Sequence, residues 1–120
     1  GEAVMADLLS RIATRGIPSL LTVLKSLGPQ NKGLLSFPTA GYTLALDIPL
    51  RDESLVPFLR ELNKTVVQAQ GRVYLAKDAI LESEDFAAMY PQLDEFNAVK
   101  RKYDPQHRFR SCLSDRLGIT

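Results

Sequence analysis

The fold is decided by the stretch Gly71-Arg72-Val73-Tyr74-Leu75-Ala76-Lys77-Asp78, which lies between one long helical pattern and two shorter ones. A glycine turn followed by apolar residues is typical of a short buried strand, and we expect one over residues 72–76. The predicted strand ends in a lysine and an aspartate, where apolar packing would otherwise continue. The stretch therefore combines a core element with charged side chains at its end.

The segment before it, from Ser54 to Gln70, has the strongest helical pattern in the chain. Its apolar stripe has helical spacing and consists of Leu55, Phe58, Leu59, Leu62 and Val66. Ser54 is expected to cap the helix, and Gly71 is expected at its C′ position. A helix packed across a sheet, with strands before and after it, predicts an α+β fold. The connection between these two strands, which contains the helix, is long enough for the strands to pair in parallel.

The clearest strand pattern upstream covers Tyr42 to Ile48. Its apolar residues Tyr42, Leu44, Leu46 and Ile48 alternate with Thr43, Ala45 and Asp47. We expect the apolar set to face a helix layer, and the second set to face solvent or a site. Residues 34–37 predict another short strand, broken by Pro38. Residues 19–28 fit either a short amphipathic helix or a buried strand, in which Lys25 would share a face with apolar residues.

Further helices are expected at both ends of the chain. Residues Glu2–Thr14 and Ser83–Met89 have helical patterns, and Pro91 suits the first position of a helix that runs to Lys102. The basic tail is expected to be irregular, with a turn of helix from Ser111 to Leu117.

Composition limits the classes of function. The chain has 120 residues, 45% of them hydrophobic, and a formal charge of +1, which predicts one domain without strong attraction to nucleic acid or to an anionic membrane. Cys112 is the single cysteine, so no internal disulfide forms, and no Cys/His cluster has metal-ligand spacing. Apolar runs fall short of the roughly 18 residues that span a bilayer, and no signal peptide is visible. We therefore predict a cytoplasmic location.

Five residues are candidates for chemistry, each with a plain structural alternative. Lys77 is either a surface lysine paired with an acid or a fixed cation aimed at developing negative charge. Tyr74 is either a core tyrosine or a hydroxyl that reaches a site. Lys25 is either a surface lysine or part of a pocket. His107 has no partner at triad spacing, and Cys112 lies among arginines that could lower its pKa.

Three blocks of sequence occur in an informative order and spacing. The blocks are residues 21–31, Leu-Thr-Val-Leu-Lys-Ser-Leu-Gly-Pro-Gln-Asn; residues 35–49, ending in Gly-Tyr-Thr-Leu-Ala-Leu-Asp-Ile-Pro; and residues 71–78, followed by Phe86-Ala-Ala-Met-Tyr-Pro91 and Arg101-Lys-Tyr-Asp-Pro105. Together they resemble the C-terminal end of FAD-linked oxidoreductases of the vanillyl-alcohol-oxidase superfamily. The resemblance covers nearly the whole chain.

The resemblance implies that residues 1–120 are the C-terminal part of a substrate-binding (cap) domain with its C-terminal tail. An FAD-binding domain would lie upstream, hold most of the FAD, and be a partner of this chain. Such a cap domain has a mainly antiparallel sheet with helices packed on one face, a ferredoxin-like arrangement. It makes residues 19–27 a strand. Gly1 is not an initiator residue, which agrees with a fragment that alone binds no FAD and is inactive.

The resemblance also implies roles for five residues. Lys77 matches a catalytic lysine near the flavin and the substrate, where a cation stabilises negative charge that develops on the flavin. Tyr74 matches a site tyrosine that contacts cofactor and substrate, and Lys25 matches a lysine of the substrate pocket. Thr43 and Ala45 would shape that pocket; a family member with a lipid-linked ribose substrate has asparagine and cysteine there.

The function implied for the longer protein is oxidation of a secondary alcohol of a sugar-like substrate, by hydride transfer to FAD. The substrate would be a small molecule or a lipid-linked sugar. The alternative is a stand-alone ferredoxin-like module that binds or dimerises without catalysis. A fragment of a larger enzyme should expose an apolar face and self-associate.

Overall fold

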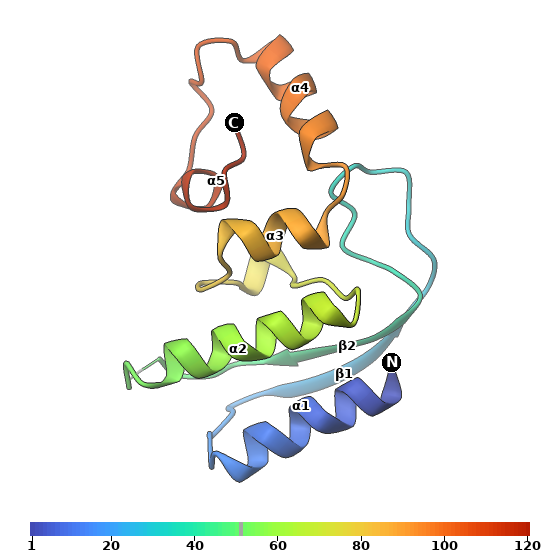
Figure 1. The fold of residues 1–120 in the computed structure, drawn as a ribbon, viewed down its shortest axis with the longest axis vertical. Helices are drawn as coiled ribbons and strands as arrows, with labels where there is room; N and C mark the ends of the chain where they lie inside the picture. Colours follow the sequence, from blue (N-terminus) through green and yellow to red (C-terminus); the bar gives the residue numbers. More distant parts are fainter. Residues whose placement is uncertain (51) are drawn as a thin grey trace.

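The computed structural model describes residues 1–50 and 52–120. Its elements, in chain order, are α1 (Glu2–Thr14), β1 (Thr22–Leu27), β2 (Gly41–Leu46), α2 (Leu55–Gln68), the 3-10 helix η1 (Leu75–Lys77), α3 (Ser83–Met89), α4 (Leu93–Tyr103) and α5 (Cys112–Leu117). Figure 1 shows α1 and α2 beside the two strands at one end of the molecule, and α3, α4 and α5 stacked toward the other. We call residues 1–70 the sheet half and residues 71–120 the helical half. The helices of the described residues are all too short or too polar to cross a membrane.

The two strands form an antiparallel sheet whose register runs from Thr22 opposite Leu46 to Leu27 opposite Gly41. Two backbone hydrogen bonds of 3.1 Å continue the pairing beyond the strand ends. The Leu20 N–H donates to the Asp47 carbonyl, and the Asp47 N–H donates to the Leu21 carbonyl. The prediction of an α+β fold with an antiparallel sheet is confirmed. Of the two alternatives for residues 19–28, the strand is observed.

Both helices of the sheet half lie on the apolar side of β2. Leu46 packs against a buried cluster formed by Leu8 and Ile12 of α1 and Leu62 of α2. At the other end of β2, the Tyr42 hydroxyl donates to Glu2 Oε1 of α1 at 3.1 Å. Two of the four apolar residues predicted to face a helix layer, Tyr42 and Leu46, therefore contact the helices.

The strand predicted over residues 72–76 is wrong. The backbone of this segment is bonded by side chains of distant residues instead of a neighbouring strand. The Val73 N–H donates to Met89 Sδ and its carbonyl accepts from the Tyr90 hydroxyl, each at 3.3 Å. The backbone N–H of Lys77 then donates to the Tyr74 carbonyl at 3.0 Å, and this bond closes the 3-10 turn η1. Because these groups are satisfied within the helical half, no parallel pair forms.

The strand predicted over residues 34–37 is also wrong, and its residues form a turn. The Asn31 side chain accepts from the Gly33 N–H at 2.8 Å, and the Ser36 N–H donates to the Gly33 carbonyl at 3.0 Å. Such local bonds compete with a strand ladder, and Pro38 cannot donate to one.

The end of α2 differs in detail from the prediction. The residue with a positive φ is Gln70, at 56°, and not Gly71. The backbone N–H of Gln70 donates to the Val67 carbonyl at 2.9 Å, and that of Gly71 donates to the Val66 carbonyl at 2.8 Å. These two bonds form a Schellman motif. Gly71 is needed for a different reason, because a Cβ there would lie 2.8 Å from Val66 Cγ1.

Two predicted helix starts are also corrected. The Ser54 side chain does not cap α2; the Asp52 carboxylate accepts from the Ser54 N–H and hydroxyl, each at 2.8 Å, ahead of the first turn. Pro91 is not the first residue of α4. It lies in a turn closed by the Leu93 N–H and the Tyr90 carbonyl at 3.0 Å, and the helix begins at Leu93.

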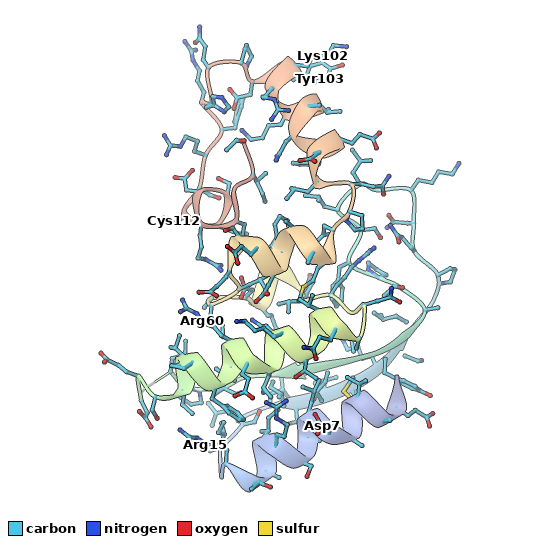
Figure 2. All side chains as sticks on the ribbon, viewed as in Figure 1. Asp7, Arg15, Arg60, Lys102, Tyr103 and Cys112 are labelled. Carbon is cyan, nitrogen blue, oxygen red and sulfur yellow. The ribbon has the colours of Figure 1, made fainter. Side chains whose placement is uncertain are left out.

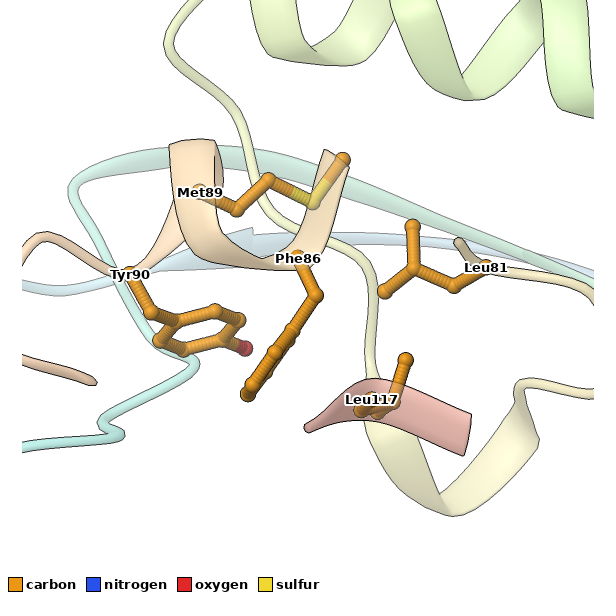
Figure 3. Packing of buried hydrophobic residues seen from close by; sticks show 5 residues of the cluster. All are labelled: Leu81, Phe86, Met89, Tyr90 and Leu117. Atoms are coloured by element: carbon orange, nitrogen blue, oxygen red, sulfur yellow. The ribbon is translucent and has the colours of Figure 1, made fainter. Parts of the chain in front are cut away.

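The core of the helical half is a cluster of five buried residues, Leu81, Phe86, Met89, Tyr90 and Leu117 (Figure 3). The rings of Phe86 and Tyr90 lie 4.9 Å apart, and Leu117 brings α5 onto α3. Burial raises the pKa of the Tyr90 hydroxyl, against the opposing charge of Arg72, so it remains a neutral donor to Val73. Val66 of α2 packs against this cluster and against the smaller one of the sheet half.

The chain exposes more surface than a compact monomer of its mass. Its accessible surface is 8013 Å² for 13.3 kDa, against roughly 6,500 Å² for a typical folded monomer of that size. Several large apolar side chains contribute, among them Leu20, which is 84% exposed, and Leu24, which is 56% exposed. Two small cores leave these side chains uncovered.

The turn after α4 is organised by Asp104, a nearly buried carboxylate. It accepts from the backbone N–H of Arg108 at 2.8 Å and of Phe109 at 3.0 Å, and from Lys100 Nζ at 3.2 Å. Burial alone would raise the pKa of Asp104, but these donors outweigh it and hold the pKa below its ordinary value.

Leu81→Ala should lower the free energy of unfolding by about 2–5 kcal/mol, because it leaves a cavity in the larger core. The matched control is Val99→Ala, since Val99 is 47% exposed; it should change stability by less than about 0.5 kcal/mol. Urea unfolding followed by circular dichroism measures both. Equal losses for the two variants would contradict this assignment of the core.

Asp104→Asn should destabilise the fold in a pH-dependent way. The folded-state pKa lies below the unfolded value of about 3.9, so the stabilisation is present above that value and is lost as the pH falls through the folded pKa. We expect the difference in urea midpoint from wild type to be largest near neutral pH and to shrink below about pH 4. Glu53→Gln, at an exposed carboxylate, is the control and should show no such trend.

Candidate functional site

A hollow of about 870 Å³ runs along β2 and toward the segment that follows α2. Residues from both halves line it, and all five residues predicted for the site are among them: Lys25, Thr43, Ala45, Tyr74 and Lys77. Strand register explains part of this arrangement. Lys25 lies opposite Thr43, and Val23 opposite Ala45, so these four side chains share one face of the sheet.

Lys77 reaches this sheet from the helical half. Its ammonium lies 2.9 Å from Asp47 Oδ1, just beyond the end of β2. Asp47 is two residues from Ala45 and four from Thr43, so strand alternation places its side chain on the same face. The ion pair is about half exposed, and such pairs contribute roughly 0–1 kcal/mol to stability. Its main effect is to fix where the Lys77 charge lies.

Tyr74 stands three residues before Lys77 and packs on the loop between the strands. Its ring centroid is 5.0 Å from that of Phe37, with the planes tilted by 45°. The tyrosine remains half exposed, which leaves its ring and hydroxyl accessible from the hollow. Phe37 also lines the hollow, so the aromatic pair forms part of its wall.

The chemistry of this lining fits the ring end of a flavin with a polyol substrate. Lys77 and Lys25 supply positive charge, Tyr74 supplies an aromatic face with a hydroxyl, and Thr43 supplies a second hydroxyl. Val23 and Ala45 give a flat apolar floor between them. The glycine-rich segment that cradles a pyrophosphate has no counterpart in this sequence. The residues of the hollow thus fit contacts to the ring system of FAD.

Asp47 and Phe37 were not predicted as site residues. The signal for Asp47 was present, because strand alternation already grouped it with Thr43 and Ala45. Phe37 could not be found in this way, since it was assigned to a strand that does not form.

Other candidates lie away from the hollow. Figure 2 shows Cys112 on α5, and Lys102 and Tyr103 at the far end of α4, remote from the sheet. Cys112 is exposed and free, and His107 lies in the turn after α4. Within residues 1–50 and 52–120, no group of three or more His, Cys, Asp or Glu residues could hold a metal ion.

Comparison with known proteins adds independent information. The chain is 40% identical over 118 residues to a Streptomyces coelicolor protein described as uncharacterized and encoded in the mprA 5′ region; the match covers 98% of this chain and 32% of that protein. It is also 40% identical over 108 residues to decaprenylphosphoryl-beta-D-ribose oxidase of Mycolicibacterium smegmatis, over 90% of this chain and 23% of that protein. The chain thus spans a third or less of the length of these relatives.

The model of one protein family, described as D-arabinono-1,4-lactone oxidase, matches residues 48–117. The matched region contains Tyr74 and Lys77 and all of the helical half except its last three residues. This match, and the similarity to the ribose oxidase, confirm the resemblance to FAD-linked oxidoreductases seen in the three sequence blocks. Since the family match covers more than half of the residues, the chain belongs to the D-arabinono-1,4-lactone oxidase family of FAD-linked oxidases.

Proposed function

We propose that this chain is the C-terminal part of the substrate-binding (cap) domain of an FAD-dependent oxidoreductase, which oxidises a secondary alcohol of a sugar-like substrate. The observation that carries the proposal is the position of the Lys77 ammonium, 2.9 Å from Asp47 on the sheet face that Lys25, Thr43 and Ala45 share. A cation there faces a hollow large enough for a substrate.

In the reaction, the alcohol would lose a hydride from its carbon to the cofactor and a proton from its hydroxyl to water, and would become a ketone. Bound FAD supplies the acceptor of the hydride, which no side chain provides. Lys77 stabilises the negative charge that develops at the reacting atoms, as a preorganised cation does. Tyr74 and Lys25 donate hydrogen bonds to substrate oxygens, and the small side chains of Thr43 and Ala45 leave room for the sugar ring.

The FAD-binding domain is proposed to be a separate, larger part of the protein that packs against this chain. Two observations support this. The chain covers 32% and 23% of the two relatives, and it exposes about 1,500 Å² more surface than a compact monomer of its mass. That excess is of the size that a domain interface buries.

The substrate is proposed to be sugar-like because the names of the family and of the relative both describe sugar derivatives, an arabinonolactone and a lipid-linked ribose. A small molecule and a lipid-linked sugar both remain substrate candidates. We propose a cytoplasmic location for the protein, on the composition of the chain.

Lys77→Met in the full-length protein should slow the reduction of FAD by substrate on the order of 10²–10³-fold, because a preorganised charge is removed from the site. Anaerobic stopped-flow absorbance of the flavin measures this rate. The control is Lys32→Met, which removes an exposed lysine of the loop between the strands and should leave the rate unchanged. An unchanged rate in the Lys77 variant would exclude the assigned role.

The isolated chain should self-associate through its uncovered apolar side chains, and Leu24→Lys should weaken that association at least several-fold without changing stability. Sedimentation velocity over a concentration series measures it. Val99→Lys is the matched control, since Val99 is similarly exposed but lies on α4. A stand-alone dimerisation module is the alternative function; a tight dimer of the full-length protein that carries no flavin would support it instead.

A further inference from the structure

The segment that carries Tyr74 and Lys77 is not part of the sheet, so no strand ladder determines where Lys77 lies. Directly after it, Asp78 is 98% buried, since its side chain is 2% exposed. Its Oδ1 accepts from the backbone N–H groups of Ile80 and Leu81, at 2.9 and 2.8 Å. The carboxylate therefore closes a tight turn immediately behind the catalytic candidate.

Arg116 of α5 completes this turn from outside. Its Nη2 donates to Asp78 Oδ2 at 2.7 Å, and its Nη1 donates to the Leu81 carbonyl. One guanidinium thus bridges the first and last residues of the turn. The Asp78 carboxylate is buried while the Arg116 side chain is 32% exposed. Removing the arginine would leave a buried carboxylate without its charged partner, so the pair favours this one geometry of the turn.

Arg116 is itself held firmly. The hydroxyls of Ser111 and Ser114 form a capping box at the start of α5. Leu117, the next residue, is 1% exposed and packs in the core. Asn97 of α4 then binds the residues after α5, donating to the Gly118 carbonyl at 3.3 Å and accepting from the Thr120 N–H at 3.1 Å.

We propose that Arg116 is a positioning residue for Lys77. Through Asp78 it sets the backbone on which Lys77 stands, while Asp47 sets the place of the ammonium 2.9 Å away. Helix α5, which contributes no residue to the hollow, would thereby control the geometry of the site. The proposal rests on the function proposed above and adds a residue outside the pocket to it.

The test is a double-mutant cycle in the full-length flavoprotein, with Arg116→Gln and Lys77→Met alone and together. Arg116→Gln should slow flavin reduction at saturating substrate by between ten- and a hundredfold, the order expected for a misplacement of about 1 Å. In the Lys77→Met background it should slow the reaction by less than twofold, because the group it positions is already gone. Equal losses in both backgrounds would overturn the proposal.

Arg110→Gln is the matched control, since it breaks the exposed ion pair of Arg110 with Asp115 in the same tail and should leave the rate unchanged. Arg116→Lys keeps the charge but cannot bridge Asp78 and Leu81 in the same way; it should fold and give an intermediate rate. Full activity of Arg116→Lys would also contradict the proposal. If Lys77→Met alone has no effect, the proposed function fails, and the action of Arg116 on the turn is decided by the hydrogen exchange described next.

Hydrogen exchange of the same proteins gives a readout that does not depend on turnover. In Arg116→Gln, amides of residues 78–81 should exchange at least tenfold faster, while those of α2 keep their wild-type protection. Arg110→Gln should change neither. Unchanged exchange in residues 78–81, or a uniform loss of protection across the chain, would show that Arg116 does not act on this turn.

Discussion

The two halves of the molecule are joined by the guanidinium of Arg72. It donates to the Met89 carbonyl at the end of α3, to the Ser36 carbonyl, and to the Gln30 side chain in the loop between the strands. Its plane also lies over the Tyr90 ring, 5.2 Å from the centroid. Charge-assisted bonds in three directions are among the stronger ones in proteins. Arg72 thus ties the interstrand loop and the segment leading to Lys77 to the core, alongside the bonds of Val73 to Met89 and Tyr90.

This arrangement has a consequence for the site. Its residues come from two strands of one half and from an irregular segment of the other, and only the strand residues are placed by a hydrogen-bond ladder. Tyr74 and Lys77 are placed by side-chain contacts, namely the Phe37 ring, Asp47, and the Asp78–Arg116 pair. Geometry that is set by side-chain contacts can be adjusted by single substitutions.

Much of the fold follows from local sequence, and the exceptions share a physical cause. Helix α1 has the bounds that its apolar spacing predicts, and most of the strand predicted over residues 42–48 forms, as β2. Residues 72–76 look like a strand because Val73 and Leu75 are apolar and alternate with other residues. What prevents the strand is Met89 Sδ and the Tyr90 hydroxyl, more than a dozen residues away. No local pattern contains that information. For the same reason the five site residues were grouped by resemblance, while their common lining of one hollow is seen only in three dimensions.

Val66 is the one apolar side chain of α2 that packs against both buried clusters. Few apolar side chains therefore connect the two buried clusters. The clusters form separate cooperative units more readily than one large core would. Such a division favours a local opening of α3, α4 and α5 with β1 and β2 still paired. Each such event releases α5, and with it the turn behind Lys77. Opening of this half alone would be enough to separate Tyr74 and Lys77 from the strand residues that line the same hollow.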